Sequence, residues 1–224
     1  MKKTFKYRLK PTKSQRARLN KILEQCRWLY NEVLAIRKNA WEQEQRSISF
    51  YDTMNMLPQL KKDRPELNIA YSQVLQNICV RLDLAFRAFF RRVKHGQNPV
   101  YPRFRGHGRY NSFTYPQSGF KLLDNQIYIS KVGNVRIKLH RPIEGTIKTL
   151  TIRRDLLGNW YACFSCDFEP VSLPKTEKAV GIDVGLKSFA TFSNGKKIDN
   201  PRFFHKDEKR LAKARPSNIP AIAP

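Results

Sequence analysis

Residues 3–9, Lys3-Thr4-Phe5-Lys6-Tyr7-Arg8-Leu9, alternate polar and apolar side chains. Successive side chains of a β-strand point to opposite faces, so the alternation predicts a half-buried strand. Pro11 ends this strand, and Thr12 and Gln15 follow with the spacing of a capping box, which starts a helix. Apolar residues then recur at helical spacing to about residue 41. The sequence therefore predicts a strand that leads directly into a long amphipathic helix.

Two more helices are expected before residue 98. One runs from about Ser49 to Lys61, with Pro58 bending or dividing it. The other has one apolar stripe, from Val74 to Val93, and extends over residues 72–94. Residues 12–98 are predicted to form a helical domain. The first two helices also allow a helix-turn-helix interpretation, which their long connection weakens.

The residue pattern changes after Gly96, where Gly, Pro and Asn separate short runs of alternating polar and apolar residues. These runs predict antiparallel strands at 112–115, 126–130, 134–139, 146–154 and 159–168, with a hairpin turn at Leu157-Gly158-Asn159. The strand at 3–9 is expected to complete this sheet or barrel. Residues 1–11 and 99–173 are therefore predicted to form one β domain.

A new element begins at residue 178. Residues 178–183 read as a buried-type strand that ends in Asp183, residues 187–193 as a second strand, and Asn194-Gly195 as a type I′ turn. Residues 203–214 have a helical pattern, and residues 215–224 form a Pro-rich tail in which no helix continues.

The composition points to a polyanionic partner. The chain has 43 Lys and Arg against 18 Asp and Glu, a formal net charge of +25 that is spread along the sequence. A folded body with this surplus repels itself, whereas each cation set against a phosphate releases a counterion. No apolar run is long enough to cross a bilayer or to form a signal peptide. Nucleic acid is the expected partner, without a membrane, in the cytoplasm and with reduced cysteines.

Cations alternate with aromatic residues between the last helix and the first strand of the β domain. Cations bind phosphates and aromatic rings stack on unpaired bases, which favours nucleic-acid contact. In the alternative interpretation, Tyr101 and Phe104 anchor the loop and the arginines are only solvated. The predicted contact residues are Arg91, Arg92, Lys94, Tyr101, Arg103, Phe104, Arg105 and Arg109, with Arg8, Lys10 and Arg27 from the first strand and helix.

Asp183 is the candidate catalytic residue, because an acid at a strand end between Gly181 and Gly185 allows close approach of a ligand. Cleavage with paired divalent ions needs several carboxylates, so one aspartate alone is equally compatible with a turn-capping role. Cys163 and Cys166 have the spacing of half a zinc site, but a strand directs them to opposite faces, so packed thiols are expected. Cys26 and Cys79 fall on apolar helix stripes and are expected in the core.

Several of these stretches together resemble the TnpB/OrfB family, the transposon-encoded relatives of RuvC-type CRISPR nucleases. Their order and spacing carry the resemblance, which covers nearly all of residues 3–213. The matching stretches are Tyr7-Arg8-Leu9-Lys10-Pro11-Thr12 with Gln15, Cys26-Arg27-Trp28-Leu29-Tyr30-Asn31, Leu57-Pro58-Gln59-Leu60-Lys61, Gln76-Asn77, Leu82-Asp83-Leu84-Ala85-Phe86-Arg87-Ala88-Phe89-Phe90, Tyr101-Pro102-Arg103-Phe104-Arg105, and 180–191 with Gly195, Asn200 and Pro201.

The resemblance implies an α+β fold: a wedge-like β-barrel with an inserted helical recognition domain, followed by the start of a RuvC-like, RNase H-like nuclease domain at 178–214. It also implies a guide RNA from the transposon end, a target DNA, and Mg²⁺ held in part by Asp183. The family's later basic helix, catalytic glutamate, four-cysteine zinc module and last aspartate have no counterpart here. The resemblance therefore implies a chain truncated within the RuvC-like domain, with an incomplete Mg²⁺ site and no zinc.

Three functions follow as hypotheses. The first is a TnpB-like protein that binds nucleic acid and does not cleave DNA alone. The second is a stand-alone DNA- or RNA-binding regulator of transposition without chemistry. The third is a nuclease completed by another chain that supplies the missing carboxylates.

Overall fold

The first strand lies in the middle of a seven-stranded antiparallel sheet. β1 (Lys2–Lys10) pairs along its length with β7 and, over its last residues, with β5. The order across the sheet is β2-β6-β7-β1-β5-β4-β3. The other strands are β2 (Ser112–Tyr115), β3 (Phe120–Leu122), β4 (Gln126–Ile129), β5 (Gly133–Lys138), β6 (Thr146–Arg154) and β7 (Trp160–Asp167). The predicted completion of the sheet by residues 3–9 is confirmed.

The structure is a computed structural model that describes residues 1–169, 179–203, 205, 207 and 208. The chain divides into two units, Met1–Pro170 and Val171–Pro224. In the described part, no helix has the length and apolar character needed to span a membrane.

The sheet of the first unit curls into a nearly closed barrel. Its two edge strands, β2 and β3, are consecutive in the chain, and the ring of Tyr115 packs against that of Phe120 at 6.5 Å. The Tyr115 hydroxyl also donates to the Ser130 carbonyl at 2.9 Å. β3 did not stand out in the sequence, because three residues are too few to show an alternation.

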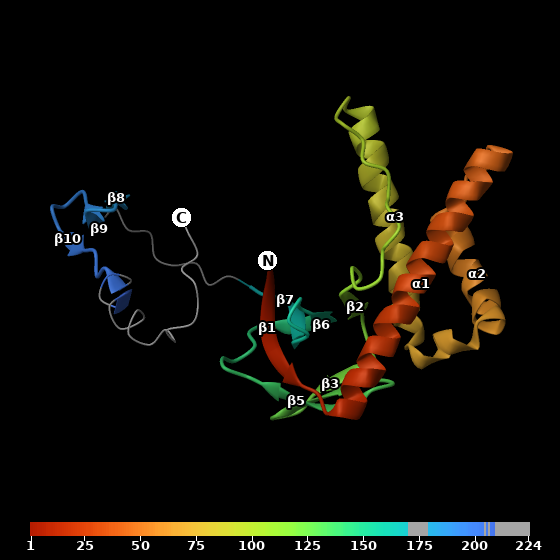
Figure 1. Cartoon of the computed structure of the whole chain (residues 1–224), viewed down its shortest axis with the longest axis horizontal. Coiled ribbons are helices and arrows are strands. Elements are labelled where there is room, and N and C mark those ends of the chain that lie inside the picture. The colour runs from red at the N-terminus through yellow and green to blue at the C-terminus, as the bar shows by residue number, and fades with distance from the viewer. Residues whose placement is uncertain (170–178, 204, 206, 209–224) are drawn as a thin grey trace, which may run out of the picture. The chain divides into compact units, whose positions relative to one another are not determined.

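Three helices and a short 3₁₀ turn are inserted between β1 and β2, and Figure 1 shows them gathered on one side of the sheet. They are α1 (Lys13–Glu44), α2 (Phe50–Asp63), the 3₁₀ turn η1 (Pro65–Ile69) and α3 (Ser72–Lys94). The capping box at Thr12 and Gln15 is confirmed, since each residue's backbone N–H donates to the other's side chain. α2 passes through Pro58 without interruption, so the proline does not divide it.

One hydrophobic core joins the sheet to the helices. The inward face of β1 supplies Phe5, Tyr7 and Leu9, and these belong to the same buried cluster as the apolar stripes of α1 and α3. Cys26 and Cys79 lie in this cluster, as predicted. The stripe of α3 leaves the core after Phe86, and the later Phe90 and Val93 are exposed. α1 and α3 diverge toward their C-terminal ends (Figure 1), so no facing helix covers these last residues.

Arg81 fastens α3 to the sheet. Its Nη1 donates to the Ser112 carbonyl and its Nη2 to the Thr114 hydroxyl, both at 2.7 Å. A partly buried guanidinium with several acceptors is well satisfied. The helices and the first strand after the insertion are therefore held in a fixed relation.

The second unit has a three-stranded antiparallel sheet in the order β10-β9-β8. Its strands are β8 (Ile182–Asp183), β9 (Ser188–Phe192) and β10 (Lys197–Asp199). The expected buried-type strand at 178–183 is wrong over its described part: the strand is two residues long and Ile182 is 57% exposed. The reason is that this small sheet has no second layer among the described residues.

Both expected hairpin turns are present. Gly158 and Gly195 have positive φ, and the N–H of each bonds back to the carbonyl three residues earlier. Asn194 does not have positive φ, so the expected type I′ geometry at 194–195 is wrong. In the predicted helix at 203–214, residues 203, 205, 207 and 208 are described and helical. The remainder of that prediction and the tail at 215–224 lie outside the described residues.

Candidate nucleic-acid interface

A segment that we call the arm, residues 95–111, connects α3 to β2 and is held to α1 by its backbone. Asn31 Nδ2 donates to the Arg105 carbonyl at 3.0 Å, and the Arg105 N–H donates to Asn31 Oδ1 at 2.8 Å. Arg27, one turn earlier on α1, donates through Nη1 to the same carbonyl at 3.0 Å. Two of the stretches that carry the family resemblance, 26–31 and 101–105, therefore meet in space.

Arg27 is itself held by an acid on α1. Its Nε lies 3.0 Å from Glu24 Oε2, and the pair is partly exposed. The hydrogen bond from Arg27 lowers the pKa of the Glu24 carboxyl, against a smaller opposing effect of burial. Arg27 was predicted as a nucleic-acid contact; the structure gives it an anchoring role, and its contact with nucleic acid stays a prediction.

The start of the arm packs against α3 through Tyr101. Its ring meets Phe86 at 5.6 Å and Phe89 at 5.3 Å, both edge to face. Phe104 is 52% exposed, and within the described part of the chain no ring or cation packs on its ring. Tyr101 therefore anchors the arm, as the alternative interpretation expected, whereas Phe104 presents an aromatic face to solvent.

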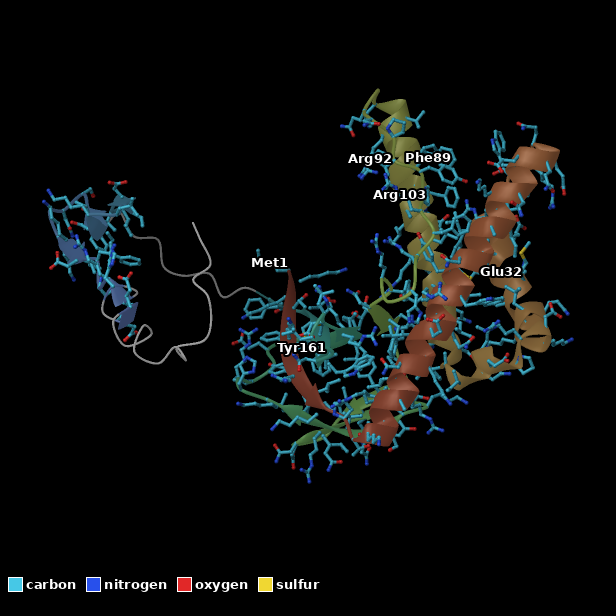
Figure 2. The ribbon with its side chains drawn as sticks, viewed as in Figure 1. Met1, Glu32, Phe89, Arg92, Arg103 and Tyr161 are labelled. Carbon is cyan, nitrogen blue, oxygen red and sulfur yellow. The ribbon has the colours of Figure 1, made fainter. Side chains whose placement is uncertain are left out.

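The arginine and lysine side chains of the arm and of the end of α3 are free of acids. None of them lies within 4.0 Å of a carboxylate among the described residues, and most are exposed. Figure 2 labels Arg92 and Phe89 on the upper half of α3 and Arg103 on the arm, which runs along this helix. The acid-free cations of the arm and of the end of α3 are Arg91, Arg92, Lys94, Arg103, Arg105 and Arg109.

An apolar groove of about 520 Å³ lies between the diverging ends of α1 and α3. Its walls are largely aromatic, with Trp41 from α1 and Tyr101 from the arm beside the end of α3. Arg37 borders it, with its guanidinium carbon 4.0 Å from the Phe86 ring centroid, and burial lowers the pKa of this arginine. The lining residues are Arg37, Trp41, Arg46, Ser47, Ile48, Phe86, Phe89, Phe90, Val93 and Tyr101.

Sequence reasoning missed this groove. It assigned Phe89, Phe90 and Val93 to the core stripe, because the periodicity cannot show where a facing helix ends. Arg91 and Arg92 gave no distinguishing signal, because basic residues are favoured in the last turn of any helix.

Arg8 and Lys10 lie in a second place, at the end of β1. Together with Arg16 and Lys138 they line a pocket of about 410 Å³. Arg8 Nη2 donates to Asn159 Oδ1 at 2.5 Å. The predicted contact residues therefore form two clusters in the first unit, one around the arm and one at the start of α1.

Asp183 lies in the second unit, exposed, at the end of β8. The other strand acid there, Asp199, is on β10, and β9 separates the two strands. Two strand spacings amount to about 10 Å, whereas paired catalytic metals lie about 3.5–4 Å apart. No group of three His, Cys, Asp or Glu suited to a metal exists in the described part of the chain. The residues described thus do not form a complete Mg²⁺ site.

The four cysteines are free thiols in the described structure. Cys166 is buried and Cys163 only half-buried, on the opposite face of β7, as the strand periodicity predicted. The expectation of packed core thiols holds for Cys166. It is wrong for Cys163. This cysteine lies on the outward face of the sheet beside Lys6 of β1, and no second layer of described residues covers that face.

Comparison with known proteins shows which family the chain is related to. Residues 1–46 match a family of helix-turn-helix domains of IS605 OrfB proteins, and residues 164–217 match the OrfB family of probable transposases. These matches define the class, a transposase-related protein of an insertion sequence. The chain belongs to the TnpB/OrfB family.

Two curated relatives are similar over most of the chain. A putative RNA-guided DNA endonuclease of Streptomyces pristinaespiralis is 34% identical, over 96% of this chain and 54% of its own. The putative RNA-guided DNA endonuclease InsQ of Escherichia coli K12 is 30% identical, over 93% of this chain and 52% of its own. The chain thus spans about half the length of these relatives. Among solved structures, a CRISPR-Cas12f ternary complex aligns with a TM-score of 0.44 and 12% identity, over 88% of this chain and 51% of that one.

The match described as a helix-turn-helix domain covers β1 and α1. In the structure this stretch is one strand followed by one uninterrupted 32-residue helix. No turn between two helices occurs within residues 1–46, so this segment does not present a recognition helix of that motif.

Proposed function

We propose that this chain is the nucleic-acid-binding part of an RNA-guided DNA endonuclease of the TnpB/OrfB type. It binds a guide RNA transcribed from the end of its own transposon and the target DNA, and it does not cut DNA alone. The names of the two relatives support the activity class. The unpaired cations of the arm beside an aromatic groove carry the proposal for this chain.

The arm is suited to a single-stranded or unpaired stretch of nucleic acid. Its cations can neutralise phosphates without first breaking an ion pair, because none is paired with a described acid. Phe104 offers an exposed ring for stacking on a base, and stacking accepts any base. The hydrogen bonds from Asn31 and Arg27 hold the arm in place before a ligand arrives, which lowers the entropic cost of binding.

We infer that the chain does not cut DNA alone from the positions of its acidic residues in the second unit. The sequence resemblance puts Asp183 in the role of the first RuvC-type carboxylate, and on that basis we assign it one share of a Mg²⁺ site. Two-metal cleavage requires further carboxylates at short distance, and Asp199 is too far away within the same sheet. We derive no catalytic step for this chain.

Binding of defined transcripts tests the proposal. The purified chain is titrated with an RNA copy of the transposon end and with a scrambled RNA of the same length, at several salt concentrations. We expect tighter binding of the native transcript, maintained at about 200 mM salt, where generic phosphate attraction is weak. Equal affinity for both RNAs would contradict the proposal and show that the chain binds RNA only through non-specific charge attraction.

A further inference from the structure

The end of β1 carries an arrangement of like charges that the fold alone does not explain. Arg8 lies directly opposite Lys138 of β5, and Lys10 lies directly opposite Arg136. Residues 8 and 10 share one face of β1, so two like-charged cross-strand pairs follow each other on the same face. Like charges directly opposite each other destabilise a sheet. A bound anion would remove this repulsion.

Three of these cations, together with Arg16 of α1, surround a pocket. Arg8, Lys10, Arg16 and Lys138 line the cavity of about 410 Å³, with Gly158 and Trp160 completing its wall. None of the four cations lies within 4.0 Å of a carboxylate in the described residues. The cations come from β1, from the first turn of α1 and from the end of β5.

Asp155, in the hairpin loop between β6 and β7, orients the neutral side chain of Asn159. Asp155 accepts from the backbone N–H of Asn159 at 2.8 Å and from its Nδ2 at 3.0 Å. The Tyr161 hydroxyl donates to the same carboxylate at 3.2 Å. The Asn159 amide is thereby fixed with Oδ1 toward Arg8, which it binds at 2.5 Å. Arg8 is thus positioned without being neutralised.

Two further residues shape the wall of the pocket. Gly158 forms part of the wall, and an added Cβ there would meet no atom within 4 Å, so the backbone leaves open space for an anion. Trp160 is 1% exposed and lies on the inward face of β7, so it closes the pocket on the side of the core.

We propose that this pocket is a phosphate-binding site, built to hold one phosphate group of a bound nucleic acid where β1 passes into α1. The site rests on the proposed nucleic-acid binding and adds to it a fixed point of attachment outside the arm. Arg8, Arg16 and Lys138 hold the phosphate oxygens, and Asn159 keeps Arg8 in place. The phosphate is either an internal phosphodiester or a terminal 5′-phosphate, which offer the same kind of oxygen acceptors.

The test uses the full chain and a short oligouridine, with either a 5′-phosphate or a 5′-hydroxyl. Lys138→Gln and Arg16→Gln each remove one pocket cation. Lys121→Gln is the matched control, because Lys121 is an exposed strand lysine of the same sheet that does not line the pocket. Affinity is measured by fluorescence anisotropy over a series of salt concentrations.

We expect each pocket variant to lower the slope of log affinity against log salt by about 0.7, the value for one neutralised phosphate of a single strand. Lys121→Gln should leave the slope as in the wild type. Weaker binding of both oligonucleotides assigns an internal phosphodiester, and weaker binding of the 5′-phosphorylated one alone assigns a terminal phosphate.

A second measurement separates a local site from general charge. The backbone amide resonance of Gly158, which lines the pocket, should shift on addition of the oligonucleotide in the wild type and shift less in Lys138→Gln. If the pocket variants and Lys121→Gln change the slope equally, or if the Gly158 resonance does not move, the phosphate site is wrong although the wild type still binds the oligonucleotide. If the wild type binds no oligonucleotide at all, the proposed function fails instead.

Discussion

Asn31 and Arg105 pair through two reciprocal hydrogen bonds although 74 residues separate them. The asparagine amide binds both the carbonyl and the N–H of Arg105, as a neighbouring strand would. The guanidinium of Arg105 takes no part in this pairing; its carbon lies 5.6 Å from the Tyr30 ring centroid. The backbone of the arm is therefore fixed to α1 while its cation stays available for a ligand.

Removing this pairing should release the arm. Asn31→Ala leaves the backbone of Arg105 without its partner, and we expect a decrease of about 1–3 kcal/mol in the free energy of unfolding. Asn39→Ala, at an exposed asparagine on the same helix, is the control and should be nearly neutral. Urea unfolding measures both, and amide hydrogen exchange at Arg105 should quicken only in Asn31→Ala. Equal stabilities would show that the arm is held by other interactions.

The cations and the exposed ring of the arm should affect RNA binding in different ways. Arg103→Gln combined with Arg105→Gln should lower the salt dependence of affinity, by a slope of about 0.7 for each phosphate that is no longer neutralised. Phe104→Ala should weaken binding at every salt concentration with the slope unchanged, because stacking involves no counterion. Filter binding of a single-stranded RNA over a salt series measures both quantities.

Lys62→Gln on the exposed face of α2 is the charge control for this pair of variants. If it reduces the slope as much as the removal of an arm cation does, the arm is not a preferred binding surface. A change of slope in Phe104→Ala would argue that the ring positions a cation rather than stacks on a base.

Replacing Asp183 should change neither DNA cleavage nor RNA binding by this chain when it acts without another protein. With Mg²⁺, guide RNA and target DNA we expect the DNA to stay intact, since one carboxylate does not hold the metal pair. Asp183→Asn should also leave RNA affinity and the melting temperature unchanged, because its side chain is exposed. Cleavage assays on a denaturing gel test this. Mg²⁺-dependent cutting by the wild type that disappears in Asp183→Asn would contradict the assignment.

The interaction of Arg27 with Glu24 should make the anchoring of the arm depend on pH. The pKa of Glu24 is lowered in the folded chain from its ordinary value of 4.5, chiefly by the hydrogen bond from Arg27. The stabilisation is therefore complete above about pH 5 and is lost as the pH falls through the lowered pKa. The difference in free energy of unfolding between wild type and Glu24→Gln should be constant from about pH 7 to about pH 5 and shrink at lower pH.

His107 complicates that measurement, because its Nδ1 lies 3.7 Å from Glu24 Oε2. The comparison is therefore repeated in a His107→Gln background. A difference between the two proteins that stays the same down to about pH 3 would show that Glu24 does not act through its charge.

The sequence predicted most of the first unit because its patterns are local. The alternation of Phe5, Tyr7 and Leu9 predicted the inward face of β1, and the pair Thr12 and Gln15 predicted the start of α1. The place of β1 between β5 and β7 was foreseen only as completion of a sheet, since register depends on partners far away in the chain. β3 and η1 are too short to produce a pattern.

The candidate site was predicted as a set of residues and not as two surfaces. The interleaving of cations and aromatics indicated Arg103, Phe104 and Arg105, but the anchoring of the arm by Asn31 arises from the tertiary fold. The repulsive cross-strand pair of Arg8 and Lys138 likewise appears only when the register of β1 and β5 is known. In the second unit, the apolar run that ends at Asp183 suggested burial that three strands cannot supply.

Sequencing the RNA that co-purifies with the chain tests the central claim most directly. The chain is expressed in its own host, purified at moderate salt, and the bound RNA is compared with total RNA. We expect strong enrichment of one transcript from the end of the transposon that encodes the chain. RNA that mirrors the total pool, or no RNA at all, would contradict specific guide binding and leave only general attraction to phosphate.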